Sequence, residues 1–88
     1  MQLLCRQEAA DHARWKEAFD DHGEARSLAG LTLMQMWREA DNAGAVWLMF
    51  DVNVRDKAEA FIDGAESQLF AERAGVTRAD WHFVKPAF

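Results

Sequence analysis

The segment Ala45-Val46-Trp47-Leu48-Met49-Phe50-Asp51-Val52 predicts a β-strand that carries apolar side chains on both faces. Because side chains alternate along a strand, Val46, Leu48 and Phe50 point to one face, and Trp47 and Met49 point to the other. A chain of 88 residues can cover one face of a sheet with its own helices but has little left for the second. We therefore expect the face of Trp47 and Met49 to meet a second protomer or to enclose a ligand.

Length and composition predict one domain over residues 1–88, because domains of this size form a single hydrophobic core. Half of the residues are hydrophobic, and the formal net charge is −5. An acidic chain without a basic stripe is a poor partner for nucleic acid or for an anionic membrane. There is one cysteine, and no apolar run approaches the roughly 18 residues that a membrane span needs. We expect a cytoplasmic protein.

Hydrophobic periodicity, helix caps and turn residues predict the order of elements. Asp11 and Asn53 are candidate helix N-caps, Gly30 and Gly75 follow the helix ends, and Gly64 predicts a bend. The chain turns between its two middle strands at residues 41–44. The predicted elements are a strand at 2–7, a helix at 11–28, strands at 31–39 and 45–52, a helix at 53–74 and a strand at 80–85.

This β-α-β-β-α-β order predicts the α+β class and a ferredoxin-like fold, with a four-stranded antiparallel sheet and both helices on one face. Strict alternation in the second strand places Met34 and Met36 on one face and Leu31, Leu33 and Trp37 on the other. Apolar side chains therefore recur on both faces of the sheet. A closed symmetric dimer would cover the face that the helices leave bare.

Residues 11–20, Asp-His-Ala-Arg-Trp-Lys-Glu-Ala-Phe-Asp, followed by Ala29-Gly30-Leu31, resemble the first helix and second-strand entry of the dimeric α+β barrel superfamily. Phe61 and Ala74-Gly75-Val76 also fit the pattern of its antibiotic-biosynthesis-monooxygenase-like domains. The resemblance implies two ferredoxin-like protomers packed sheet to sheet, with pockets between each sheet and its helices. The superfamily that the chain resembles includes cofactor-independent oxygenases, haem-degrading enzymes, isomerases and proteins of no known activity. This fold alone therefore does not decide the chemistry.

The chain departs from the catalytic branches that it resembles. It contains no tyrosine, a residue that often positions substrate in the oxygenase branch. Asn53 and His82 do not match the Asn, Trp and His constellation of the haem-degrading branch, so we expect no haem and no other cofactor. The histidines and the cysteine have no metal-ligand spacing, so we expect no metal site.

The first predicted helix carries two polar residues on its apolar face. On a helical wheel, His22 and Arg26 fall on the stripe of Trp15 and Phe19, one turn apart. In a functional interpretation, His22 is a general base or hydrogen-bond donor and Arg26 clamps an anion. In the structural alternative, a backbone carbonyl satisfies His22, and Arg26 extends to solvent near the helix end.

Three classes of function follow from these residues. The first is a cofactor-independent monooxygenase or isomerase of a small aromatic or polyketide-like compound, with His22 catalytic and Arg26, Phe19, Phe50 and Phe61 binding the ligand. The second is a noncatalytic binder or sensor of a small apolar or aromatic molecule, and the third is a dimeric structural module. A cavity beside His22 and Arg26 would favour a ligand site, whereas complete filling of that space by Phe50 and Phe61 would exclude it.

Overall fold

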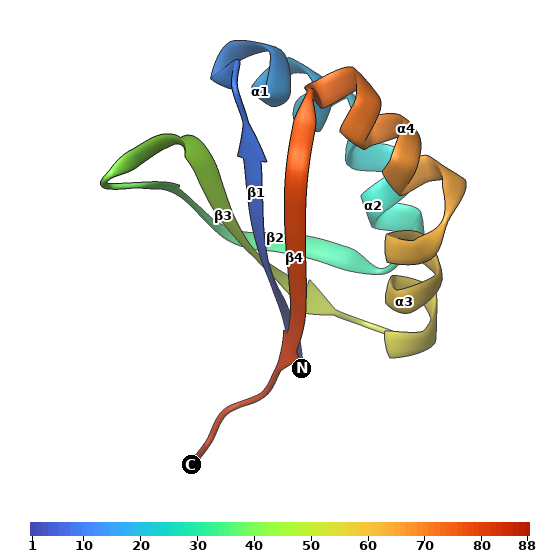
Figure 1. Ribbon diagram of the computed structural model, residues 1–88. Coiled ribbons are helices and arrows are strands. Elements are labelled where there is room, and N and C mark those ends of the chain that lie inside the picture. Colours follow the sequence, from blue (N-terminus) through green and yellow to red (C-terminus); the bar gives the residue numbers. More distant parts are fainter.

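A four-stranded sheet with four short helices packed against it makes up the computed structural model, which describes all of residues 1–88 (Figure 1). The elements are β1 (Gln2–Ala9), α1 (His12–Asp21), α2 (Gly23–Leu28), β2 (Leu31–Glu39), β3 (Asn42–Val52), α3 (Arg55–Asp63), α4 (Ala65–Ala74) and β4 (Val76–Val84). The strand order is β2-β3-β1-β4, and every neighbouring pair is antiparallel. This arrangement confirms the predicted ferredoxin-like α+β fold.

Each of the two predicted helices is interrupted in the structure. At His22 the backbone tightens, because its N–H donates to the Phe19 carbonyl three residues back, at 3.2 Å. Gly64 is extended, with φ −89° and ψ 173°, and separates α3 from α4. A Cβ at Gly64 would lie 2.7 Å from the Ala60 carbonyl oxygen, so a larger residue would force the backbone to move. The bend at Gly64 was predicted, and the continuous helix through His22 was wrong.

The helix ends follow the sequence only in part. Asp11 is the predicted cap of α1, and its carboxylate accepts a hydrogen bond from the Arg14 backbone N–H at 3.1 Å. Gly75 ends α4 in the left-handed region with φ 71°, as expected of a glycine stop. The prediction for Asn53 was wrong: Val54 occupies the cap position of α3, without a side-chain hydrogen bond.

The strands extend further than predicted. Pairing of Ala9 with Val76 lengthens β1 and starts β4 four residues before Asp80. Pairing of Glu39 with Asn42 narrows the hairpin turn to residues 40–41, so the turn predicted at 41–44 was wrong. The ends of the strands are set by hydrogen bonds to the partner strands. Local turn residues do not reveal these hydrogen bonds.

The helix-facing side of β3 forms the centre of the core. Val46, Leu48 and Phe50 are at most 2% exposed, which confirms that their face meets the helices. From β1, Leu3 and Cys5 complete the same layer. The helices supply Trp15, Ala18, Phe19, Ala58, Phe70 and Ala74.

A bulge at Met34 changes which face the second half of β2 presents. Leu33 pairs with Phe50, but Gln35 pairs with Met49, so one extra residue is inserted in β2. Met36 then lies opposite Leu48 and packs against the core, while Trp37 lies opposite Trp47. The predicted faces of Met36 and Trp37 were therefore wrong, because alternation reverses beyond the bulge.

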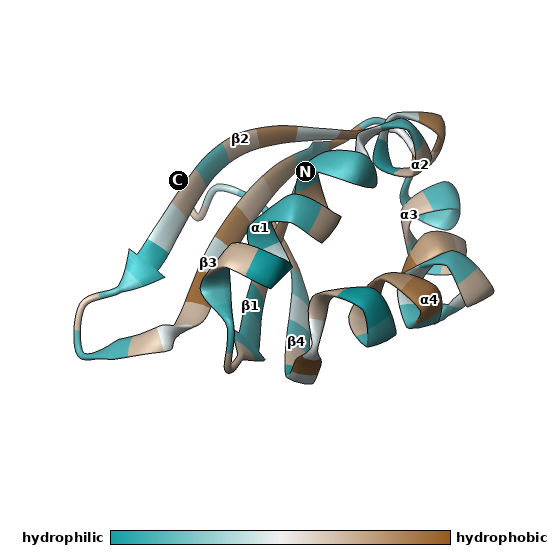
Figure 2. Cartoon of the chain, turned by 90° about the horizontal axis from the view of Figure 1, so that it is seen from above, coloured by the Kyte–Doolittle hydropathy of each residue, from teal (hydrophilic) through white to brown (hydrophobic).

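The other face of the sheet is bare in the isolated chain. Trp37 is 45% exposed there, and Trp47 and Met49 are half-buried. The β2–β3 hairpin also reaches beyond the helices (Figure 2). None of the four helices is long and apolar enough to cross a membrane.

Candidate functional site

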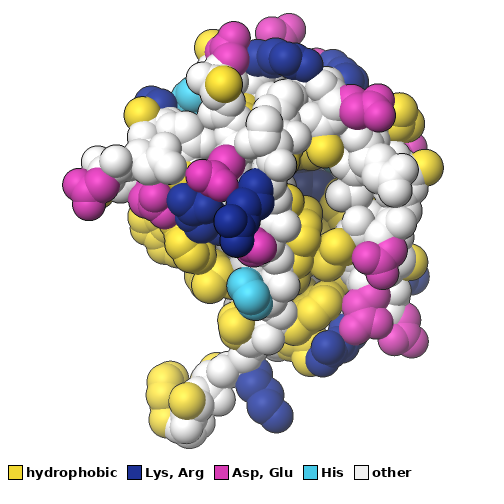
Figure 3. Space-filling model, in the orientation of Figure 1, with side chains coloured by type: hydrophobic (Ala, Val, Ile, Leu, Met, Phe, Trp, Pro, Cys, Tyr) yellow, Lys and Arg dark blue, Asp and Glu magenta, His cyan; other side chains and the backbone are white.

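A cavity lies between the helix layer and the sheet. Its enclosed space is about 20 Å³, room for about one water molecule. Figure 3 shows the molecule hollowed between β4 and the α3–α4 pair, with hydrophobic side chains on the walls. The structure brings all five sequence-predicted site residues to this cavity: Phe19, His22, Arg26, Phe50 and Phe61. Five further residues, Gln7, Leu48, Ser67, Phe70 and Trp81, complete the lining.

His22 occupies the break between α1 and α2, and its side chain is 13% exposed. Its Nε2 lies 3.3 Å from Oε2 of Glu66 on α4. The imidazole stacks on Phe70, with ring centres 5.2 Å apart, and lies 5.7 Å from the ring of Phe61. The side-chain partner of His22 is thus a carboxylate and not the backbone carbonyl that the structural interpretation required.

His22 also borders a second, open cleft on the outer surface. This cleft lies between α2 and α4, where Glu24, Leu28, Glu66 and Arg73 line it. One imidazole therefore separates the outer cleft from the inner cavity. A carboxylate on the solvent side and a small cavity on the other side would allow His22 to relay a proton between them.

Arg26 folds back into the cavity instead of extending to solvent. Its Nη1 donates to the Phe19 carbonyl at 2.7 Å, and its Cζ lies 3.7 Å from the centre of the Phe19 ring. Arg26 takes part in no ion pair within 4.0 Å. Burial lowers the pKa of the Arg26 guanidinium from its ordinary value, and the negative charge of Asp20 opposes this shift. The group still stays charged at neutral pH.

Gln7 is a polar residue of the cavity that was not predicted. It is 3% exposed, and its Oε1 accepts a hydrogen bond from the Trp15 indole N–H at 2.8 Å. Its Nε2 lies 3.5 Å from the Cys5 sulfur. Burial raises the pKa of the Cys5 thiol to about 12, so this cysteine is not a nucleophile at neutral pH. The sequence did carry a signal, since Gln7 shares the inward alternation of Leu3 and Cys5.

Ser67, Phe70 and Trp81 were also missed. Ser67 and Phe70 follow the break at Gly64, so their direction depends on where α4 restarts. Trp81 pairs with Cys5, which places it on the helix side of β4. His82, considered as a residue that reaches a pocket, instead lies opposite Leu4 on the outer face and is exposed.

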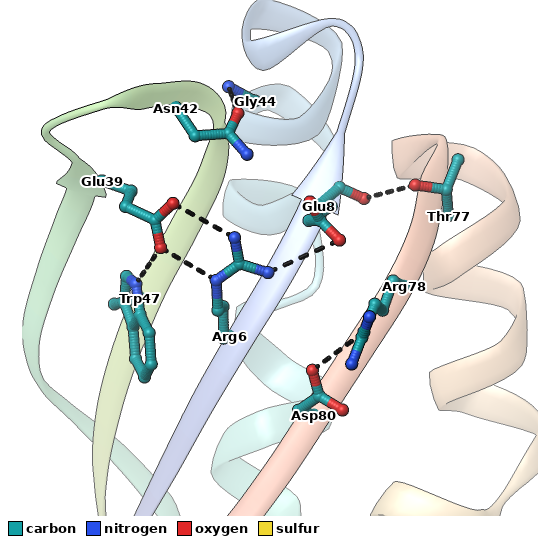
Figure 4. Close-up of polar contacts among 9 residues, drawn as sticks. All are labelled: Arg6, Glu8, Glu39, Asn42, Gly44, Trp47, Thr77, Arg78 and Asp80. Atoms are coloured by element: carbon teal, nitrogen blue, oxygen red, sulfur yellow. Dashed lines mark hydrogen bonds and ion pairs between the residues drawn. The ribbon is translucent and has the colours of Figure 1, made fainter.

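The outer face carries a polar cluster of its own (Figure 4). Arg6 forms a bidentate pair with Glu39, at 2.9 and 3.1 Å, and also lies 3.4 Å from Glu8. The Trp47 indole N–H donates to Glu39 at 2.9 Å. Hydrogen bonds from Arg6 and then from Trp47 lower the pKa of Glu39 to about 2. The indole of Trp47, a predicted interface residue, is thereby tied to Glu39 on the outer face.

No three His, Cys, Asp or Glu side chains come together in an arrangement that would hold a metal ion. The chemistry available at the cavity is proton transfer by His22 and stabilisation of negative charge by Arg26.

No protein-family model matches the chain, and neither does any curated protein sequence. Solved structures do match it along its length. A provisionally named antibiotic biosynthesis monooxygenase from Bordetella bronchiseptica superposes with a TM-score of 0.79 at 13% identity, covering 99% of this chain and 96% of that one. A second protein so named, from Nitrosomonas europaea, gives a TM-score of 0.65 at 14% identity, with both chains fully covered.

An uncharacterised NIPSNAP domain protein from Burkholderia xenovorans matches almost as well, with a TM-score of 0.66 at 15% identity over 99% of this chain and 95% of that one. Identities this low show a shared fold and leave the activity open. The structure therefore confirms the resemblance seen in the sequence: this chain has the α+β fold of the antibiotic-biosynthesis-monooxygenase-like proteins.

Proposed function

We propose that the protein binds a small organic molecule in the cavity between its helices and its sheet, and acts on it as a cofactor-independent monooxygenase or isomerase. The observation that carries this proposal is the meeting of His22 and Arg26 inside an aromatic cavity, with Glu66 behind the imidazole. The names of two matching structures point in the same direction.

In this proposal His22 removes a proton from an acidic C–H group of the substrate. Glu66 orients the imidazole and stabilises its charged form. Arg26 stabilises the negative charge that develops on the substrate oxygen. An isomerase would return the proton at another carbon. In a monooxygenase the resulting enolate would reduce dioxygen, with one oxygen atom entering the product and the other leaving as water.

The cavity must widen before it admits a substrate, because its enclosed space is about 20 Å³. The two helix breaks, at His22 and Gly64, offer positions where the helix layer could move without disturbing the sheet. The walls of Phe50, Phe61 and Trp81 would then exclude water from the reacting atoms.

The test is oxygen uptake by the wild-type protein with anthrone, an aromatic ketone with an acidic C–H group. His22→Ala should lower the enzyme-dependent rate about 100-fold or more. His82→Ala is the matched control, because this exposed histidine lies on the other face of the sheet. No uptake above the uncatalysed rate, across anthrone and related ketones, would contradict the oxygenase; a rate unchanged by His22→Ala would exclude His22 as the base.

A noncatalytic binder or sensor is the second candidate, because the aromatic lining of the cavity could hold a ligand without turnover. Such a protein would bind aromatic ligands without turnover, and His22→Ala would only weaken binding. If His22→Ala lowered stability and no ligand bound, the protein would be the third candidate, a structural module.

We further propose that two copies pair through their bare sheet faces in the cytoplasm. Support for the dimer comes from the exposed Trp37 beside the half-buried Trp47 and Met49. Support for the location comes from the single, buried and unpaired Cys5. Sedimentation at micromolar concentration should give twice the chain mass of 10.0 kDa, and a monomer there would contradict the pairing.

A further inference from the structure

The cavity differs in charge from the rest of the molecule. The chain has 15 acidic and 10 basic residues, Lys and Arg, and a formal net charge of −5. None of its acidic residues lines the inner cavity, where Arg26 is the only Lys or Arg side chain. An acidic protein thus encloses one cavity without carboxylates and with a guanidinium on its wall.

Arg26 also differs from the other arginines. It is half-buried and pairs with no carboxylate. The six other arginines either hold carboxylates or are exposed and donate to backbone carbonyls: Arg6, Arg55, Arg73 and Arg78 in the first group, Arg14 and Arg38 in the second. A partly desolvated cation without an opposite charge costs free energy, and an anionic ligand would compensate for it.

The position of Arg26 is fixed before any ligand arrives. Its Nη1 is held by the Phe19 carbonyl, and its plane is held by the Phe19 ring. A guanidinium has five N–H donors, and the other four donate to no protein acceptor in this structure. They form a fork that matches two oxygen atoms of one carboxylate.

Two other polar residues of the cavity, Gln7 and Ser67, can also donate. Trp15 occupies Oε1 of Gln7, and one N–H of the amide donates to the Cys5 sulfur at 3.5 Å, which leaves the second N–H as a donor. The hydroxyl of Ser67 has no protein partner and can donate. Phe50, Phe61 and Trp81 supply flat apolar walls. The enclosed space is about 20 Å³, so a ring enters between these walls only when the helix layer moves outward.

We infer that the natural ligand is an organic anion: a planar aromatic or conjugated molecule whose carboxylate, phenolate or enolate oxygen binds Arg26 while its ring lies among Phe50, Phe61 and Trp81. This inference rests on the proposed ligand cavity and adds the charge of the ligand. A cation would be repelled by Arg26, and a neutral molecule would leave the guanidinium unpaired.

Benzoate and benzamide test the inference, because they share one shape and differ in charge at neutral pH. In an NMR titration of the full chain, the four tryptophan indole N–H signals report binding. Single Trp→Phe variants assign each signal to its residue. Benzoate should shift the Trp81 signal and leave Trp37 and Trp47, on the outer face, unchanged. Benzamide should bind about tenfold or more weakly, since the charge-assisted hydrogen bonds are lost.

The variant Arg26→Gln should abolish the preference for benzoate, and Arg26→Lys should keep part of it, because lysine retains the charge but lacks the fork. Arg38→Gln is the matched control: it removes the same charge from another arginine without a carboxylate partner, on the exposed end of β2. Circular dichroism would verify the fold of each variant.

Equal binding of benzoate and benzamide, or benzoate binding unchanged by Arg26→Gln, would overturn the anionic ligand and leave the cavity as a neutral ligand site. Benzoate shifts confined to Trp37 and Trp47, or no benzoate binding at all, would also overturn it. Oxygen uptake with anthrone tests the proposed reaction separately, so the two failures are distinguishable.

Discussion

Trp15 and Gln7 share a buried hydrogen bond, so the effects of substituting them on the free energy of unfolding should be coupled. A double-mutant cycle can measure this coupling. The indole N–H donates to Oε1 of Gln7 at 2.8 Å, and the two residues are 1% and 3% exposed. Gln7→Leu leaves the indole donor without an acceptor in the core. Trp15→Phe leaves the amide oxygen without its donor. In the double variant both polar groups are gone, so neither is left buried and unpaired.

The size of the coupling follows from this burial. An unpaired buried donor or acceptor costs about 1–3 kcal/mol. The single variant Gln7→Leu also gains apolar contacts, so its own stability change combines two opposing terms. The coupling energy removes the second term, and we expect about 2 kcal/mol. For a chain of 88 residues, this corresponds to a departure from additivity of about 8–16 °C in melting temperature.

Urea unfolding of the wild type, both single variants and the double variant, at one protein concentration, gives the coupling energy. Gln35→Leu combined with Trp15→Phe is the control, because Gln35 is an exposed strand residue on the outer face. That control pair should be additive within about 0.5 kcal/mol. Additivity of Gln7→Leu and Trp15→Phe would refute the reasoning.

Two further predictions concern the loss of stability at acidic pH and the helix break at Gly64. The folded pKa of Glu39 is about 2, against an ordinary value of 4.5, so its stabilisation is present above about pH 4.5 and is lost as the pH falls towards 2. Glu39→Gln should therefore lose less stability than wild type over that range; equal losses in urea midpoint would contradict the pairing with Arg6. Gly64→Ala should destabilise by about 1–3 kcal/mol, because its Cβ meets the Ala60 carbonyl at 2.7 Å. Gly23→Ala, with its nearest contact at 3.6 Å, should be neutral or stabilising by up to about 1 kcal/mol, and thermal melts that rank the two the other way would contradict the structure.

The order of strands and helices could be predicted because it depends on local patterns. Each of these patterns depends only on residues close in the sequence. Examples are the strand at 45–52 with apolar residues on both faces, the helix cap at Asp11 and the helix stop at Gly75. The bulge at Met34 could not be found in this way. Residues 31–37 read Leu-Thr-Leu-Met-Gln-Met-Trp, which has apolar side chains in both alternation classes. Only pairing with β3 decides which of them face the core.

The candidate site was predictable on the helix side and not on the sheet side. His22 and Arg26 conflicted with the apolar stripe of their own helix, so a wheel was sufficient to find them. Glu66 became a partner of His22 only through the packing of α4 against α1, a contact between segments 44 residues apart. Gln7 stood out less, since one polar residue at the end of a short predicted strand has an ordinary explanation at the surface.

Several departures from ordinary packing meet at one cavity. Gln7 is a polar side chain in the core, Arg26 is a half-buried cation without a carboxylate, and His22 lies where a helix breaks. Gly64 interrupts the opposite helix just before Glu66 and Ser67, which lie at the same site. A sequence under selection for stability alone would replace these groups with apolar residues and continuous helices, because each change is available at low cost. Natural proteins break such local rules chiefly at functional sites, and their concentration around one cavity is therefore the strongest physical argument that this cavity binds a ligand.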